Sequence, residues 1–364
     1  MAEAARINPS PVIRRALFVG LGSVGQRHLR NVRALLGDSL AIDAFRVRRE
    51  QAVLDDFQQV VPGASLESRY GVEAFTDFDR ALARGPDVVF ITNPSSLHVP
   101  IASKAAEAGA HLFIEKPLSH SLDGVDELCA LTERRGLVAF VAYQLRRHPG
   151  FARLKQRLEQ GSVGRPLCVR AEVGEYLPGF HPYEDYRRMY ASQRALGGGV
   201  TLSQIHELDY LIALFGRPRR AFSMGGKVSE LEVDVDDLSS SLVEFRRPDG
   251  GRLIAELHQD FFQRPTSRSC VVIGESGRLE WNLSERRFRH WDASSSLVEE
   301  EDYSAFPRNQ AFVEELEHFL GCIARRSRPD IGLREGAQSL ELALGLLRSQ
   351  ETGLPVDFQE KASS

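Results

Sequence analysis

Ala16–Gly25, with the sequence ALFVGLGSVG, is the stretch that decides the fold of the first part of the chain. Its apolar half, Ala16–Gly20, predicts a buried strand, and the pattern that follows predicts a helix over Ser23–Leu36. Apolar runs and helical patterns then alternate as far as residue 142, which is typical of βαβ units and a parallel sheet with helices on both faces. The further elements expected are strands at Leu40–Phe45, Asp87–Ile91, Ala110–Ile114 and Leu137–Ala142 and helices at Leu97–Ala108 and Asp123–Arg135.

Three glycines in this stretch have the spacing of a dinucleotide-binding turn between a strand and a helix. We expect Gly20 to permit the tight turn, Gly22 to let the backbone approach a pyrophosphate, and Gly25 to let helix and strand pack closely. The first helical residues, Ser23 and Val24, would offer free N–H groups to the phosphate charge. A plain strand–turn–helix, or a site for a flavin or another nucleotide, is the alternative.

The pattern changes after Tyr143, where extended runs separated by turns replace the βαβ units. Runs joined by hairpin turns predict a largely antiparallel sheet, so we expect an α+β domain in this part. A chain of 364 residues is also long for one hydrophobic core, which favours two domains. The elements expected are a helix at Phe151–Gln160, strands at Leu167–Tyr176, Arg219–Lys227, Ser239–Arg246, Arg252–Asp260, Ser269–Ile273 and Gly277–Trp281, and helices at Asn309–Ala324 and Arg334–Arg348.

Composition and charge exclude several classes of function. The chain has 42% hydrophobic and 26% charged residues, which is ordinary for a globular protein, and its net charge of −4 gives no electrostatic case for binding nucleic acid or an anionic membrane. No apolar run approaches the roughly 20 residues of a membrane span, and the N-terminus lacks the pattern of a secretory signal. A soluble cytoplasmic protein is therefore expected.

Neither the cysteines nor the acidic residues predict a metal site. The four cysteines are dispersed, which indicates reduced thiols and neither a disulfide framework nor a zinc site. Asp234, Asp236 and Asp237 lie close together, but they lack the full ligand loop of a calcium site, so a solvated turn is expected there.

Arginines follow the second predicted strand, where a nicotinamide dinucleotide carries its adenine ribose. An acidic residue at this place binds the ribose hydroxyls of NAD, whereas arginine accommodates the 2′-phosphate of NADP. Arg46 and Arg48 therefore favour NADP(H), with NAD(H) still possible and simple solvation of the arginines as the alternative. Asp43 lies inside the strand, which is too early for the ribose contact.

Polar residues also follow the Asp87–Ile91 strand, at the sheet edge where ligands of such folds bind. Asn93, Pro94, Ser95 and His98 are expected to contact the ribose or the nicotinamide. Asparagine and serine also favour helix caps, so a capping role is the alternative, and both roles can hold together.

The next strand is followed directly by Glu115-Lys116-Pro117. Glu115 and Lys116 are expected near the cofactor, and a lysine at this edge can also donate a hydrogen bond or a proton to a substrate oxygen. Taken alone, Lys116 would more often be an ordinary surface lysine.

The order of these motifs resembles the glucose–fructose oxidoreductase, inositol dehydrogenase and rhizopine catabolism (Gfo/Idh/MocA) family. The resemblance rests on GLGSVGQRHLRNV, NPSSLH, AGAHLFIEKPLS and a glycine triplet with a downstream histidine, and it spans about residues 14–350. It implies a Rossmann dinucleotide-binding domain (1–143), an open-sheet substrate and oligomerisation domain (144–330) and a C-terminal helix that packs back on the first domain (331–364). It also implies homodimers or homotetramers, and hydride transfer between NAD(P) and sugar or cyclitol hydroxyls.

The resemblance also implies roles for individual residues. Lys116 matches the family's catalytic or substrate-orienting lysine, and Gln144 and Arg146 lie in a segment that is near the nicotinamide in the family. His206 matches the histidine near the reacting carbon, and Asp209 follows three residues later. Lys116 and His206 are thus the expected catalytic residues, Gln144 a cofactor contact, and Arg146 and Asp209 substrate contacts.

One position departs from the family pattern. The family often has an aspartate four residues before the histidine, where this chain has Leu202. Ser203 or Gln204 could offer a polar group to the substrate, but neither replaces an ionised carboxylate as a base. We therefore expect His206, which titrates near neutrality, and Lys116 to carry the proton transfer.

A loop rich in aromatic and basic residues, Glu175–Arg194, precedes the glycine triplet. Tyr186 and Arg187 are expected to contact substrate, because aromatic rings stack on sugars and arginine pairs with carboxylates or phosphates. A contact between subunits is an equal alternative, since tyrosine and arginine are also enriched at interfaces.

Together these motifs predict an NAD(P)-dependent dehydrogenase or reductase of a sugar, amino sugar or nucleotide sugar, with NADP(H) favoured. Two rivals stay open. One is another enzyme on the same frame, such as a ketone or pyrrole-ring reductase or a lyase that uses its nicotinamide transiently. The other is a non-catalytic module that senses NADP(H).

Overall fold

The structure is a computed structural model that describes residues 13–47, 52–55, 58–247 and 249–358. Its contacts divide the chain into two units. The first comprises residues 1–118, 123–142 and 312–333, and the second comprises residues 119–122, 143–311 and 334–364. This division lies within one residue of the expected boundary at 143. Residues 334–364 are grouped with the second unit, however, whereas the C-terminal helix was expected to return to the first domain.

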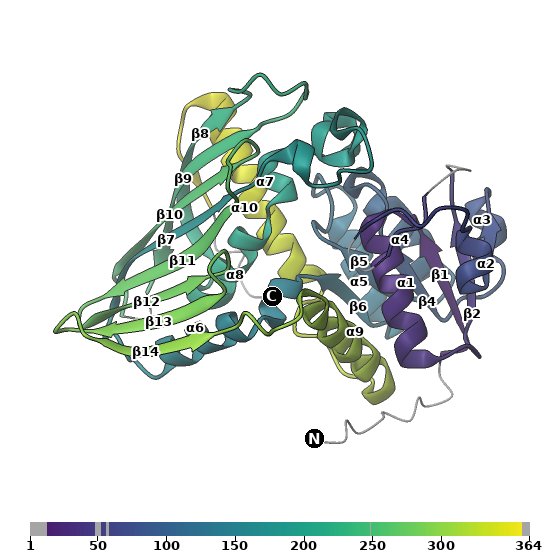
Figure 1. Ribbon diagram of the computed structural model, residues 1–364, viewed down its shortest axis with the longest axis horizontal. Coiled ribbons are helices and arrows are strands. Elements are labelled where there is room, and N and C mark those ends of the chain that lie inside the picture. Colours follow the sequence, from purple (N-terminus) through teal and green to yellow (C-terminus); the bar gives the residue numbers. More distant parts are fainter. Residues whose placement is uncertain (1–12, 48–51, 56–57, 248, 359–364) are drawn as a thin grey trace. The chain divides into compact units, whose positions relative to one another are not determined.

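Six parallel strands form the sheet of the first unit, in the order β3-β2-β1-β4-β5-β6 (Figure 1). This topology confirms the predicted Rossmann fold. The strands are β1 (Arg15–Val19), β2 (Ala41–Phe45), β3 (Val72–Phe75), β4 (Val88–Ile91), β5 (His111–Glu115) and β6 (Ala139–Ala142). The helices are α1 (Ser23–Leu36), α2 (Leu66–Tyr70), α3 (Phe78–Leu82), α4 (His98–Glu107), α5 (Val125–Arg135) and the larger part of α9 (Arg308–Arg325).

A row of phenylalanines crosses this sheet and forms the centre of its core. Phe18, Phe90, Phe113 and Phe140 occupy paired positions on four neighbouring strands, and successive ring centroids are 4.5, 5.2 and 5.4 Å apart. Phe319 of α9 packs edge-on against Phe113 at 5.4 Å. Burial of one such side chain stabilises the fold by roughly 1.5–3 kcal/mol. The row therefore joins α9, which is distant in sequence, to the parallel sheet.

The elements α2, β3 and α3 lie between residues 66 and 82 and were not predicted from the sequence. Each has only four or five residues, which is too short for a helical or alternating period to show. Ser65 and Asp77 cap the two helices through their side chains. These caps are the local signal that could have located them.

Nine strands form the sheet of the second unit, in the order β14-β13-β12-β11-β7-β10-β9-β8-β15. Only β7 and β10 pair in parallel, which confirms the predicted, largely antiparallel sheet. The strands are β7 (Pro166–Gly174), β8 (Pro218–Gly226), β9 (Leu238–Arg246), β10 (Arg252–Asp260), β11 (Ser267–Gly274), β12 (Gly277–Asn282), β13 (Arg287–Asp292), β14 (Leu297–Asp302) and β15 (Val356–Asp357). The helices are α6 (Pro149–Glu159), α7 (Val200–Ser203), α8 (His206–Phe215) and α10 (Leu333–Thr352).

One face of this sheet is packed against helices. In Figure 1, α6, α7 and α8 lie on the same side of the sheet, and they contact β12, β9 and β7 respectively. Residues along β9 and β10 alternate between buried and exposed positions, as expected when only one face meets the core. The other face exposes apolar side chains, among them Met224 and Leu242. No helix among the described residues is both long enough and apolar enough to cross a membrane.

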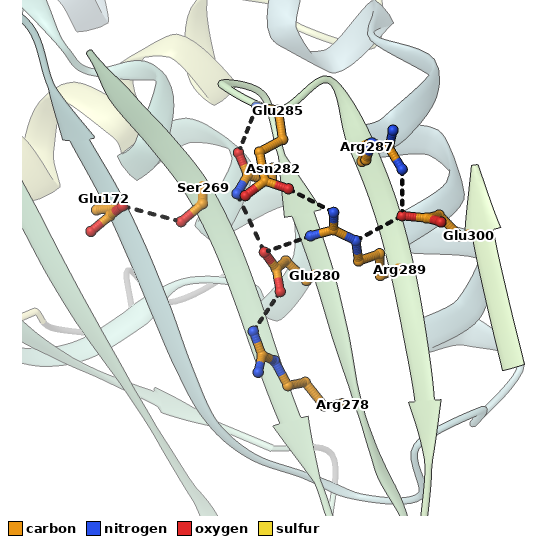
Figure 2. A network of polar contacts seen from close by, with 9 residues as sticks. All are labelled: Glu172, Ser269, Arg278, Glu280, Asn282, Glu285, Arg287, Arg289 and Glu300. Carbon is orange, nitrogen blue, oxygen red and sulfur yellow. Dashed lines mark hydrogen bonds and ion pairs between the residues drawn. The ribbon is translucent and has the colours of Figure 1, made fainter. Parts of the chain in front are cut away.

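The strands at one end of the sheet carry a ladder of ion pairs (Figure 2). Arg289 of β13 lies opposite Glu280 of β12 and Glu300 of β14, and its Nε is 2.9 Å from Glu300 Oε1. Arg287 donates to the same oxygen at 2.8 Å, and Arg278 pairs with Glu280. Exposed pairs contribute only about 0–1 kcal/mol each. The charges on the edge strand β14 mainly discourage pairing with a foreign strand.

β13 and β14 were not predicted from the sequence. Their sequences, RFRHWD and LVEEED, are so rich in charge that they look like solvated segments. The opposite charges lie on neighbouring strands and neutralise one another only once the strands have paired. These strands are therefore recognised by the opposite charges of two segments that pair, and not by a regular alternation of apolar and polar residues within either segment.

His148 is expected to make the second unit less stable at low pH. Its Nδ1 accepts the N–H of Gly150 at 3.0 Å and so caps α6, and its ring packs against Trp281 and Phe306. Burial lowers the pKa of His148 from 6.5 to about 4. Below pH 6.5 the unfolded chain binds a proton here that the folded chain does not bind, so this site favours unfolding progressively as the pH falls toward 4.

We expect His148→Asn to flatten the pH dependence of stability in this window. Asparagine also caps a helix but does not titrate. Wild type should lose about 2 kcal/mol more free energy of unfolding than the variant between pH 7 and pH 4. Urea unfolding at several pH values measures the difference. Parallel curves for the two proteins would contradict the assignment.

Candidate active site

Two glycines of the turn in the first unit, Gly20 and Gly25, have no space for a side chain. Gly20 has φ +87°, and a Cβ there would lie 3.1 Å from the backbone of Asn93. A Cβ on Gly25 would lie 2.6 Å from the carbonyl oxygen of Gly20 and 2.7 Å from Thr92 Oγ1, distances shorter than real Cβ contacts. The turn therefore needs glycine for its backbone conformation at 20 and for close packing at 25.

The N-terminus of α1 is shaped to take an anion. Gly22 is the N-cap, no side chain caps the helix within the described residues, and the first turn carries no acidic residue. Gln26, which was not predicted, fixes the loop in front of it: its Nε2 donates to the carbonyls of Leu21 and Ala52, and its Oε1 accepts the N–H of Leu54. The half-buried Ser23 and Val24 thus stand at the positive end of a helix, which fits the pyrophosphate of a dinucleotide.

The residues after β2 have internal partners. Arg46 Nη1 is 2.8 Å from Glu67 Oε1 of α2, and the Arg46 side chain is only 9% exposed. Asp43 is buried inside the strand against Arg15, at 2.8 Å, which agrees with its expected position too early for a ribose contact. Arg48, the other predicted phosphate contact, lies outside the described residues.

The segment after β4 presents a polar atom that fits a ligand. Asn93 Oδ1 is buried and has no hydrogen-bond partner among the described residues, so a bound donor would satisfy it. Pro94 is the N-cap of a short 3₁₀ turn, Ser95–Leu97, in which Ser95 is buried. His98 starts α4, and its two ring nitrogens face the carbonyls of Asn93 and Pro117. The glycine turn and Asn93 together fit a nicotinamide dinucleotide.

Glu115 and Lys116, at the end of β5, have different environments. Glu115 lies on the same face of the sheet as Phe113, is 6% exposed, and accepts a hydrogen bond of 2.6 Å from His28 Nε2 of α1. Its other oxygen accepts the backbone N–H of Lys116 at 3.1 Å. These partners hold Glu115 in place beside Lys116, and its contact with the cofactor stays a prediction. Lys116 itself is half-buried.

His28, Glu115 and Glu315 form one buried cluster. Their ligand atoms lie within 4.8 Å of one another. Neither His28 nor Glu315 was predicted from the sequence. Only the fold brings together residues from α1, β5 and α9, so no local pattern could have grouped them.

The predicted site residues of the second unit gather around the start of α8. His206 is the first residue of α8, and its ring meets that of Tyr143 edge-on at 5.7 Å. Gln144 begins the 3₁₀ turn that follows Tyr143, and its Oε1 is buried with no hydrogen-bond partner among the described residues. A bound hydrogen-bond donor would therefore satisfy the amide oxygen of Gln144, as it would that of Asn93.

Arg146 and Asp209, the predicted substrate contacts, are bonded to each other. Arg146 Nε and Nη2 donate to the two carboxylate oxygens of Asp209, both at 2.7 Å, and Ser339 of α10 adds a hydrogen bond at 3.2 Å. Asp209 is 1% exposed. The carboxylate of Asp209 thus holds Arg146 in one orientation, and a contact of either residue with substrate stays a prediction.

The residues just before His206 are buried. Leu202 and Ser203 belong to α7, and Gln204 Nε2 donates to the carbonyl of Asp260 at 3.0 Å. Gln204 is therefore engaged with the end of β10, and Thr201 bonds Asp236, so Ser203 is the neighbour of Leu202 whose side chain is proposed for the substrate.

The residue after His206 anchors α8 to the sheet. Glu207 is completely buried, and both its oxygens accept hydrogen bonds of 2.8 Å from Arg268 of β11. Burial raises the pKa of Glu207 and the charge of Arg268 opposes the shift. This pair was not predicted, because its partners are 61 residues apart.

The loop Glu175–Arg194 is packed by its own side chains. The ring of Tyr186 packs against a cluster that includes Met189 and Phe261, and its hydroxyl accepts the N–H of Glu232 at 3.2 Å. Arg187 pairs with Asp185 and with Glu232. Tyr186 and Arg187 thus support the loop conformation.

The expected solvated turn at Asp236 and Asp237 is wrong, because both residues are buried. Asp236 accepts hydrogen bonds from the N–H and the hydroxyl of Thr201, at 3.0 and 2.6 Å. A Cβ on Gly199, which has φ +110°, would lie 2.0 Å from Asp236 Oδ1. Asp237 accepts the N–H groups of Val228 and Ser229. The carboxylate of Asp236 therefore fills the space beside Gly199, the last glycine of the triplet.

A Rossmann sheet with a glycine-rich phosphate turn, and a lysine at the carboxyl edge of the same sheet, define the class of NAD(P)-dependent oxidoreductases. A model of the oxidoreductase family with an NAD-binding Rossmann fold matches residues 14–143, and a model of the GFO/IDH/MocA C-terminal domain matches residues 151–280. The chain belongs to the Gfo/Idh/MocA family, which confirms the resemblance found in the sequence.

Characterised proteins of similar length match over almost the whole chain. Scyllo-inositol 2-dehydrogenase (NAD(+)) of Bacillus subtilis (strain 168) is 24% identical over 363 residues, covering 95% of this chain and 97% of that protein. Among solved structures, levoglucosan dehydrogenase in complex with NADH has a TM-score of 0.77 at 19% identity, covering 94% and 98% of the two chains. The WlbA dehydrogenase from Bordetella pertussis, in complex with NADH and UDP-GlcNAcA, has a TM-score of 0.75 at 22% identity, covering 96% and 99%.

Proposed function

We propose that this chain transfers a hydride between NADP(H) and a hydroxyl or keto carbon of a sugar, amino sugar or nucleotide sugar. The observation that carries the proposal is the placement of Lys116. It leaves β5 next to the segment after β4 in which Asn93 presents an unsatisfied amide oxygen. The similar proteins named above carry the names of an inositol dehydrogenase and a levoglucosan dehydrogenase, which supports a polyhydroxylated substrate.

Each proposed catalytic residue has one task. The dinucleotide, when bound, accepts or supplies the hydride. Lys116 donates a hydrogen bond to the substrate oxygen and polarises it, and His206 exchanges the hydroxyl proton. Arg146, held in one orientation by Asp209, and Ser203 are proposed substrate contacts, while Gln144 and Asn93 are proposed cofactor contacts. Tyr186 and Arg187 remain candidates for the far end of a larger substrate.

A substrate panel tests the proposed function. Sugars, cyclitols and nucleotide sugars are offered with NADP(H) and with NAD(H), and the nicotinamide absorbance is followed. Turnover of at least one polyhydroxylated compound with net change of the cofactor is expected. Product formed without net cofactor change would indicate a lyase, and dinucleotide binding without any turnover would indicate a sensing module.

The preference for NADP(H) rests on Arg46. We expect Arg46→Gln to weaken NADPH binding about tenfold and to leave NADH binding within twofold, because a charge-assisted contact to phosphate contributes roughly 1.5–3 kcal/mol. Fluorescence titration of both dinucleotides measures the two constants. Glu67→Gln, which removes the present partner of Arg46, is the control and should not weaken NADPH binding. Equal losses for both cofactors would refute the preference.

The exposed sheet face supports a homo-oligomer. Met224 and Leu242 are 67% and 51% exposed on neighbouring strands, β8 and β9, and apolar residues grouped on a sheet face favour association. We propose a dimer or tetramer formed through this face. Sedimentation velocity would show a single monomeric species if the proposal is wrong.

A further inference from the structure

His98, the first residue of α4, is buried between two segments of the first unit. Its Nδ1 lies 3.0 Å from the carbonyl oxygen of Pro117, and its Nε2 lies 2.8 Å from the carbonyl oxygen of Asn93. Both neighbours are acceptors, so each contact is a hydrogen bond only while the facing nitrogen carries a proton. The ring therefore connects the segment after β4 with the segment after β5.

In the neutral ring only one of the two nitrogens carries a proton, so only one of the two contacts is a hydrogen bond. Burial lowers the pKa of His98, although the neighbouring carbonyls and Glu115 oppose the shift, so the neutral form with a single N–H prevails at neutral pH. Both contacts are within hydrogen-bond distance, 3.0 Å from Nδ1 to Pro117 and 2.8 Å from Nε2 to Asn93, so the tautomer decides which carbonyl is bonded.

The backbone on the other side of Lys116 is also held. Its N–H donates to Glu115 Oε2 at 3.1 Å, and Glu115 Oε1 is fixed in turn by His28 at 2.6 Å. The carboxylate of Glu115 thus holds the backbone N–H of Lys116. The ring of His98 faces the carbonyl of the next residue, Pro117. Both groups are buried, so water does not compete for these hydrogen bonds.

We propose that His98 is a positioning residue for Lys116: its Nδ1–H holds the carbonyl of Pro117 and so fixes the backbone from which the lysine side chain extends. The inference rests on the proposed function, in which Lys116 contacts the substrate. It replaces the direct cofactor contact that the sequence suggested for His98. A misplacement of a catalytic group by about 1 Å is enough to cost roughly 10²-fold in rate.

Two isosteric variants separate the contacts of the ring. The side-chain nitrogen of asparagine takes the place of Nδ1 and that of glutamine the place of Nε2. We expect His98→Gln, which loses the donor to Pro117, to lower kcat about 10²-fold, with KM and the dissociation constant for NADPH within threefold of wild type. His98→Asn, which keeps that donor, should retain kcat within fivefold. Thermal unfolding shows whether both variants fold.

The outcomes distinguish failure of this inference from failure of the proposed function. If Lys116→Ala keeps full turnover, the proposed function is wrong, whatever the His98 variants do. If Lys116→Ala is inactive while His98→Gln turns over like wild type, the positioning role is wrong. Equal losses in the two His98 variants, a loss of NADPH affinity in place of kcat, or failure of His98→Gln to fold would also overturn it.

Discussion

Lys116→Ala is expected to lower kcat about 10³-fold and to leave NADPH binding within threefold of wild type. The loss follows because the variant removes the group proposed to polarise the substrate oxygen, and one acid–base group contributes roughly 10²–10⁴-fold. Binding persists because the phosphate turn at Gly20 and Gly25 and the N-terminus of α1 do not involve the lysine. Steady-state turnover and fluorescence titration with NADPH measure the two effects separately.

Lys116→Arg is the matched control for charge. Arginine keeps the positive charge and donates hydrogen bonds, but its planar guanidinium differs in shape from the compact ammonium group of lysine. Substrate affinity should stay close to that of wild type while kcat stays low, because polarisation of the substrate oxygen needs the donor at one fixed place. Recovery of kcat in the arginine variant would show that charge alone suffices. Unchanged turnover in Lys116→Ala would remove the lysine from the catalytic machinery.

Arg268→Met is expected to cost about 3–5 kcal/mol of unfolding free energy. The variant leaves Glu207, which is completely buried, without the guanidinium that bonds both its oxygens, and an uncompensated buried carboxylate carries a penalty of that size. The residue before Glu207 is His206, so the start of α8 should also lose its fixed position. Urea unfolding measures the effect.

Two further variants give this prediction its controls. Glu207→Gln combined with Arg268→Met removes both charges and should recover part of the loss, because no ion is left unpaired. Arg287→Met breaks the pair with Glu300 on the open face of the sheet, where the arginine side chain is 38% exposed. It should cost no more than about 1 kcal/mol. Equal losses for Arg268→Met and Arg287→Met would contradict the argument from burial.

The sequence was most informative where local pattern and chemistry coincide. α1 spans Ser23–Leu36 as predicted, because a glycine turn starts it, Gly37 ends it and an amphipathic pattern runs between them. The core strands β1, β4, β5 and β6 were located by short apolar runs. The order of the glycine turn, the Asn93 segment and the Lys116 segment along the chain was enough to indicate the family.

Charged segments were predicted less well from the sequence. The acidic and basic runs of β13 and β14 resemble solvated segments, and their opposite charges neutralise one another only once the two strands have paired. Asp236 and Asp237 resemble a surface turn, yet they accept backbone N–H groups from Thr201 and Val228 respectively. In both cases the partner lies on another segment, and a period within one segment does not reveal it.

The sequence by itself thus determined the Rossmann unit, the antiparallel sheet, the dinucleotide turn and the candidate lysine, since each depends on residues close together along the chain. Tertiary structure alone decided what those residues touch. It placed Glu115 against His28, Arg46 against Glu67 and Arg146 against Asp209, pairs separated by 87, 21 and 63 residues. The physical reason is burial. A buried charge or polar group is stable only with a hydrogen-bond or ion-pair partner, and the fold supplies that partner from a segment that the spacing of residues along the sequence does not identify.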